Sequence, residues 1–300
     1  MISVGIFNGY FPYTLEESIA RIKSHGFSCV QLDLCFKDMD LDWRKLDAAK
    51  CHTIRDAFRV ANLPIVCISG YINLVHPDLG QRKDNIDYLK TLLKFARDLG
   101  TPYVISETGT YNLESDWVFD PKNATEAAYQ EIKGVISELA AHAHAHNAVF
   151  LVENYIQNII GSVDQLLRLF ADVQSPGLGL LLDPTNYFTD RNIDDVDGEL
   201  NRIFNALGDR VKIAHAKDIK RAENTGEKHA SIDASEAHSF RGAGAVELPA
   251  PGLGVLNYDL YLKRLSDLYP NIPIIIEHLD EADVPRAKKF LDDKLLALGV

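Results

Sequence analysis

The sequence alternates along its whole length between short apolar runs with strand character and longer amphipathic stretches with helical periodicity. Helical patterns include 15–26, 85–100, 124–147, 162–173 and 258–270, and several of them end in Gly or Asn, as helix C-termini do. The strand-like runs lie at 2–7, 29–36, 64–73, 102–108, 149–154, 178–183, 211–215 and 274–278. Eight strand–helix repeats predict an α/β protein built as a single (β/α)8 barrel, also called a TIM barrel.

An open, doubly wound sheet is the main alternative, but its first strand would normally lead into a glycine-rich phosphate loop. The first strand here continues as GIFNGYF, which lacks that loop. Because no low-complexity linker interrupts the repeats, we predict one domain over residues 1–300 with two long loops. The loop near 107–121 lies on the face that carries active sites in such barrels, and the loop near 221–251 is expected to be a lid or a subunit contact in a homo-oligomer.

The net charge and the hydropathy of the chain limit the classes of molecule that it is expected to bind. With 31 basic and 43 acidic residues the formal net charge is −12, which argues against nucleic acid because its binders neutralise phosphates with clustered Lys and Arg. No apolar run approaches the roughly 18 residues of a membrane helix, and no basic leader precedes an apolar stretch. We therefore expect a cytoplasmic protein that binds a small molecule and no membrane. The four cysteines form no C-x-x-C pair, so buried thiols are expected.

Four strand-like runs end in a residue of a metal-binding type. The motifs are LVENY, LLDPTN, IAHAKD and IIIEHL, which carry Glu153, Asp183, His215 and Glu277. Alternate strand residues face the same way, so each of the four inward-facing series ends in a potential ligand at the barrel mouth. Each residue alone could instead cap a helix or bond a loop. As a set without thiolates, the four predict a divalent ion, with Mn²⁺, Mg²⁺ or Co²⁺ favoured and Zn²⁺ as an alternative.

These motifs, together with PGLG before the last helix pattern, resemble those of the xylose isomerase-like barrel superfamily, in particular sugar epimerases of the tagatose 3-epimerase type and their sugar-phosphate isomerase relatives. The resemblance spans nearly the whole chain. It implies that Glu153, Asp183, His215 and Glu277 bind the metal and that Glu153 and Glu277 are the catalytic proton carriers. A metal that chelates a carbonyl and its neighbouring hydroxyl would stabilise an enediolate between the two proton transfers. The expected activity is therefore sugar epimerisation or aldose–ketose isomerisation.

Three further residues are predicted to bind substrate. Asn186 stands where related epimerases often have a histidine, and its amide can still bind a sugar hydroxyl. Arg221, six residues beyond His215, matches a substrate-contacting position, although a surface location is equally expected. Glu107 ends the fourth strand and could bind a hydroxyl, support the metal or anchor a loop. Asp218 could orient the imidazole or cap the next segment.

Other functions fit the same residues. A dehydratase of the inosose or dehydroshikimate type would use the same metal but let the enolate expel a β-hydroxyl. An AP-endonuclease-like DNA repair enzyme would need a histidine-rich trinuclear zinc site, and both the acidic charge and Asn186 disfavour it. A barrel that binds carbohydrate without catalysis is also conceivable. The histidines at 142, 144 and 146 are expected at a helix C-terminus rather than in a second metal site.

Overall fold

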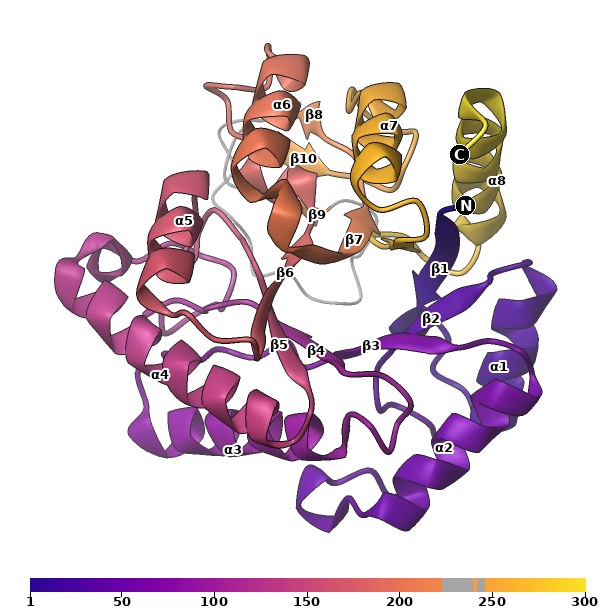
Figure 1. The fold of residues 1–300 in the computed structure, drawn as a ribbon, viewed down its shortest axis with the longest axis horizontal. Coiled ribbons are helices and arrows are strands. Elements are labelled where there is room, and N and C mark those ends of the chain that lie inside the picture. The colour runs from indigo at the N-terminus through magenta and orange to yellow at the C-terminus, as the bar shows by residue number, and fades with distance from the viewer. Residues whose placement is uncertain (223–239, 242–245) are drawn as a thin grey trace.

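The computed structural model of the protein describes residues 1–222, 240–241 and 246–300. Parallel strands form a closed barrel (Figure 1). β1 completes it by pairing with both β2 and β11. This confirms the predicted (β/α)8 fold. The barrel strands are β1 (Ser3–Phe7), β2 (Cys29–Leu32), β3 (Ile65–Ser69), β4 (Tyr103–Ser106), β5 (Val149–Glu153), β6 (Leu178–Leu182), β7 (Val211–Ala216) and β11 (Pro273–Ile276).

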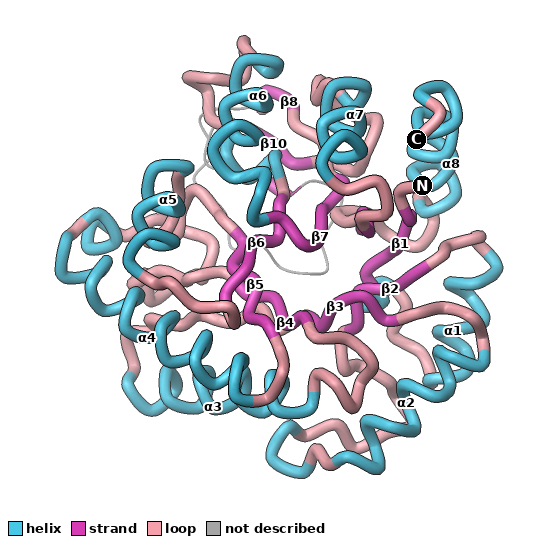
Figure 2. Tube along the Cα trace, in the orientation of Figure 1, coloured by secondary structure: helices cyan, strands magenta, loops and turns pink. Residues whose placement is uncertain are grey.

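Helices surround the strands on the outside (Figure 2). Most of them begin at a Ser, Thr, Asp or Asn whose side chain accepts a backbone N–H of the first turn, as Thr14 and Ser162 do. These caps fix where each loop at the barrel mouth ends. The helices are α1 (Leu15–Ser24), α2 (Ala48–Val60), α3 (Leu79–Phe95), α4 (Glu126–Ala145), α5 (Val163–Asp172), α6 (Val196–Leu207), α7 (Tyr258–Leu268) and α8 (Val284–Leu298).

The region between β7 and α7 contains a second, small sheet. Its antiparallel strands, in the order β8–β10–β9, are β8 (Lys220–Arg221), β10 (Val246–Leu248) and β9 (Phe240–Arg241). The sequence predicted no regular structure here, because strands of two or three residues leave no periodicity to detect. The rest of the loop predicted near 221–251, including residues 223–239 and 242–245, lies outside the described residues.

The barrel interior is layered. Alternate strand residues face the same way, so one set packs outward against the helices, as Phe150 and Leu180 do. The inward set forms a separate apolar cluster of Cys29, Cys67, Ile105, Leu151, Leu181, Ile213 and Ile275. Two residues further along the chain from each member of this cluster, the side chain is polar: Gln31, Ser69, Glu107, Glu153, Asp183, His215 and Glu277. An apolar floor therefore supports a polar layer at the mouth of the barrel.

The cysteines are all free, and three of the four are buried, as expected from their sequence context. Over the described part of the chain, no helix combines the length and the apolar character that crossing a lipid bilayer demands.

Candidate metal centre

The four predicted metal ligands meet at the carboxyl end of the barrel. Ligand atoms of Glu153, Asp183 and His215 all lie within 4.8 Å of one another. Nδ1 of His215 is 3.4 Å from Oε1 of Glu153 and 3.3 Å from Oε2 of Glu277, which brings Glu277 into the same group. The side chains are buried, with exposures of 1% for Glu153, 1% for Asp183, 0% for His215 and 6% for Glu277. The parallel strands bring these four residues together because β5, β6, β7 and β11 end at one edge.

A glutamine that the sequence analysis did not single out orients the imidazole. Nε2 of Gln31 donates to Oε1 of Glu277 at 3.0 Å and to Oγ of Ser69 at 3.1 Å. Because an ionised carboxylate only accepts, the amide oxygen of Gln31 must face the other way, 2.8 Å from Nε2 of His215. Nε2 of the imidazole is therefore the donor, and Nδ1 faces the carboxylates.

This orientation suits a metal ligand. Within the described residues, the buried Nδ1 of His215 has no hydrogen-bond partner, although two carboxylate oxygens lie near it. Burial alone would lower the pKa of His215, but the carboxylates of Glu277 and Glu153 outweigh it and raise the pKa. The site thus attracts either a proton or a metal cation at Nδ1. Three carboxylates and one inward-facing imidazole nitrogen form a donor set that fits a divalent ion.

A buried lysine also belongs to the group, and the sequence analysis missed it. Nζ of Lys217 lies 2.8 Å from Oδ2 of Asp183, 3.2 Å from Oε2 of Glu277 and 3.8 Å from Oε1 of Glu153. Burial would lower the pKa of Lys217, but Asp183, Glu277 and Glu153 together hold it well above the usual value. The side chain is therefore an ammonium ion. A signal was available, because Lys217 follows His215 by two positions and so shares its inward direction.

Asp183 is held so that one oxygen faces the group. Its Oδ1 accepts hydrogen bonds from N of Thr185 at 2.9 Å and from Oγ1 of Thr185 at 2.6 Å, which begins the short 3-10 helix Pro184–Tyr187. Oδ2 is left to face Lys217. The same short helix carries Asn186, whose Nδ2 donates to Oε1 of Glu153 at 2.9 Å. The predicted substrate residue Asn186 therefore lies beside the candidate metal ligands.

Side chains with hydroxyl and amide groups also lie around Glu153. Tyr71 donates its hydroxyl hydrogen to Oε2 of Glu153 at 2.5 Å. The amide oxygens of Asn186 and Asn154 are buried and accept no hydrogen bond from any described residue. A buried acceptor without a donor is costly, so the amide oxygen of Asn186, whose amide nitrogen contacts Glu153, is suited to a ligand that brings hydroxyl groups.

Glu107 lies at the same mouth. Its Oε2 accepts a hydrogen bond from Nδ2 of Asn158 at 3.3 Å. Burial, reinforced by the negative charge of Glu153, raises the pKa of Glu107 well above its ordinary value. The loop that follows it packs nearby through Trp117, whose ring meets that of Tyr155 edge to face at 5.8 Å.

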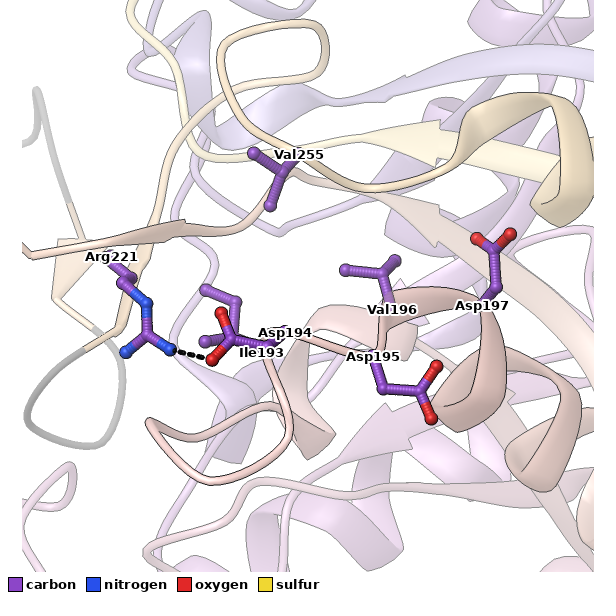
Figure 3. Close-up of a pocket in the computed structure, with 7 residues that line it drawn as sticks. All are labelled: Ile193, Asp194, Asp195, Val196, Asp197, Arg221 and Val255. Carbon is purple, nitrogen blue, oxygen red and sulfur yellow. Dashed lines mark hydrogen bonds and ion pairs between the residues drawn. The ribbon is translucent and has the colours of Figure 1, made fainter.

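Arg221 lies on the surface, half exposed. It pairs with Asp194 at 2.7 Å, and both line a depression of about 730 Å³ together with Asp195, Val196 and Val255 (Figure 3). Of the described residues, Asp194 is the ion-pair partner of Arg221. The structure therefore does not place Arg221 in contact with the group around His215.

Two other residues have structural roles. Asp218 accepts backbone hydrogen bonds from Ile219, Gly252 and Leu256, so it stabilises the loop before α7. The residue that orients the imidazole of His215 is Gln31 and not Asp218. His142 lies in the last turn of α4, and its Nε2 is 3.0 Å from the backbone oxygen of Lys90.

Fold and site together define a (β/α)8 barrel with a carboxylate–histidine centre at its mouth. The family model described as xylose isomerase-like TIM barrel matches residues 19–294, and the chain belongs to that family. None of the curated proteins matches the chain.

Solved structures with the same fold cover nearly the whole chain. A xylose isomerase-like TIM barrel protein from Mycobacterium smegmatis, in complex with magnesium, has a TM-score of 0.70 at 16% identity, covering 99% of this chain and 96% of its own. The probable 3-DHS dehydratase AsbF from Bacillus anthracis has a TM-score of 0.71 at 16% identity, with coverages of 97% and 99%. D-psicose 3-epimerase from Clostridium cellulolyticum H10, solved with D-tagatose, has a TM-score of 0.67 at 15% identity and covers 99% of each chain. At these identities the likeness concerns the fold alone.

Proposed function

We propose that the protein is a divalent-metal-dependent sugar epimerase or aldose–ketose isomerase. One observation carries the proposal: two buried carboxylates, Glu153 and Glu277, lie 3.4 and 3.3 Å from the same imidazole nitrogen of His215, with Asp183 beside them. A divalent ion bound by these residues would polarise a substrate carbonyl and make the neighbouring C–H more acidic.

The carboxylates of Glu153 and Glu277 are the proposed proton carriers. One removes the proton next to the carbonyl, and the other returns a proton. Return to the opposite face of the same carbon inverts its configuration, which is epimerisation. Return to the neighbouring carbon exchanges aldose and ketose. Neither outcome needs a redox cofactor.

Substrate binding is assigned to the polar groups around this pair. The unpartnered amide oxygen of Asn186 can accept a hydrogen bond from a sugar hydroxyl, and the carboxyl group of Glu107, whose pKa is raised, can donate one when it carries its proton. The role predicted for Arg221 would require it to leave Asp194, and it stays a prediction. The substrate class that fits these groups is a small carbohydrate.

The metal is proposed to be Mn²⁺, Mg²⁺ or Co²⁺, with Zn²⁺ as an alternative, because the donor set is oxygen-rich and contains no thiolate. The magnesium complex of the Mycobacterium smegmatis barrel supports an oxygen-preferring ion.

Dehydration is the second candidate, and Glu107 favours it. Loss of a β-hydroxyl requires a proton donor for the leaving oxygen, and the carboxyl group of Glu107, whose pKa is raised, could supply that proton. The fold shared with the probable 3-DHS dehydratase of Bacillus anthracis is consistent with this alternative.

The test is isotope exchange. Protein loaded with Mn²⁺ is incubated in D₂O with a panel of ketoses and aldoses, with metal-stripped protein as control, and products are followed by NMR and mass spectrometry. An epimerase or isomerase places deuterium on a carbon next to the carbonyl, and its product has not lost water. A dehydratase gives a product lighter by one water. Exchange that proceeds equally in metal-stripped protein would contradict the proposal.

A further inference from the structure

The ammonium group of Lys217 lies among the oxygens that a metal would use. It is 2.8 Å from Oδ2 of Asp183 and 3.2 Å from Oε2 of Glu277, and only 5% of the residue is exposed. Lys217 comes directly after β7, two residues beyond His215. Its inward direction therefore continues the alternation of β7, in which His215 faces the same way.

The surrounding charges explain why an internal cation is needed. Glu153, Asp183 and Glu277 bring three carboxylates into a region that is almost closed to water. Buried carboxylates without a positive partner are strongly destabilising. Lys217 is within 4 Å of all three, so in the metal-free protein it compensates part of their charge.

A divalent ion and this ammonium group would compete for Oδ2 of Asp183 and Oε2 of Glu277, because two cations that share these oxygens repel each other in a medium of low polarity. The lysine side chain has four rotatable bonds and can withdraw.

We propose that Lys217 is an internal counter-cation that competes with the divalent metal for Asp183 and Glu277. It stabilises the barrel mouth before the metal arrives, and metal binding displaces it. The inference rests on the proposed function in one respect, namely that a divalent ion binds at this site.

The direct test is the Mn²⁺ dissociation constant of the Lys217→Met variant, measured by calorimetry on metal-stripped protein. Methionine keeps most of the side-chain volume and removes the charge. Loss of the competing cation is expected to tighten Mn²⁺ binding by about tenfold or more. Lys212→Met is the matched control, because it removes the same charge from an exposed position on the same strand and should leave the affinity unchanged. Unchanged or weaker binding in Lys217→Met would overturn the inference.

Thermal unfolding gives a second readout. Metal-free Lys217→Met should unfold at a lower temperature than the wild type, and saturating Mn²⁺ should raise its melting temperature by more than it raises that of the wild type. If the variant does not fold without metal, Mn²⁺ should restore folding, and failure to do so would overturn the inference. Wild-type protein that binds no divalent metal would overturn the proposed function as well, whereas equal affinities in both proteins would remove only the role of Lys217.

Discussion

The amide oxygen of Gln31 lies 2.8 Å from Nε2 of His215, and this contact turns the other imidazole nitrogen toward Glu153 and Glu277. Gln31 cannot be reversed, because its amide nitrogen is committed to Glu277 and Ser69. A residue on β2 thus determines which nitrogen of a residue on β7 is available to a metal. Such outer contacts hold a ligand in its productive tautomer and orientation.

Replacing Gln31 by Leu should therefore weaken divalent metal binding. The imidazole would lose its acceptor at Nε2, and Glu277 would lose a donor. Losses of about 10- to 100-fold in metal affinity are typical for contacts of this kind. Calorimetric titration of metal-stripped protein with Mn²⁺ measures the effect. Gln31→Glu, which keeps an acceptor for His215 but places a second carboxylate against Glu277, should also bind more weakly. Wild-type affinity in Gln31→Leu would show that the contact does not control the site.

Replacing either proposed proton carrier by its amide should abolish turnover with little effect on the fold. Glu153→Gln and Glu277→Gln keep the side-chain volume but remove the base, and loss of a positioned acid or base typically costs about 10²- to 10⁴-fold in rate. Circular dichroism should be unchanged. Glu281→Gln is a suitable control, because Glu281 bonds Tyr13 and Arg21 away from the group. Full activity in both site variants would refute the assigned chemistry.

Glu107 should make the metal-free protein less stable as the pH rises. The folded-state pKa of Glu107 lies above the ordinary value of 4.5, so the folded protein holds this proton more tightly than the unfolded chain. The contribution of Glu107 to the free energy of unfolding is therefore greatest at low pH, and it is lost as the pH rises from about 4.5 through the raised pKa. Glu107→Gln cannot ionise, so it should be more stable than the wild type at neutral pH and equal to it near pH 4. Melting temperatures of both proteins across this range measure the difference, and parallel curves would contradict the prediction.

The apolar floor beneath the site should contribute strongly to the free energy of unfolding. Leu181 is fully buried two residues before Asp183, and Leu181→Ala should lower the free energy of unfolding by about 2–5 kcal/mol through lost burial and a residual cavity. Leu167→Ala on α5, where the side chain is 40% exposed, should cost much less. Urea unfolding of the two variants makes the comparison, and equal losses would argue against a tightly packed floor.

Much of this arrangement could be predicted from the sequence, because side chains alternate in direction along each strand and the strand–helix unit repeats along the chain. Glu153, Asp183, His215 and Glu277 each lie at or just beyond the end of an apolar run, and parallel strands bring their carboxyl ends to one edge. The same alternation along the second strand predicts that Gln31, two residues after Cys29, also faces inward and belongs to the polar layer. It was overlooked because an amide is not a metal ligand.

Other features depend on contacts that sequence spacing does not encode. The spacing of Lys217 from His215 indicates its inward direction, but not its distances of 2.8 Å to Asp183 and 3.2 Å to Glu277, which depend on how the long side chain folds. Arg221 was placed by its separation from His215, whereas the structure puts it in β8 of a small antiparallel sheet, paired with Asp194. Strands of two or three residues carry no recognisable pattern, so their position could not be anticipated.

We propose above all that Glu153, Asp183, His215 and Glu277 bind one divalent ion. Crystals grown with Mn²⁺ and measured near the manganese absorption edge test it most directly. The account predicts one anomalous difference peak within about 2.0–2.3 Å of Nδ1 of His215 and of oxygens from the three carboxylates. An anomalous peak elsewhere, or none between these four side chains at saturating Mn²⁺, would contradict it.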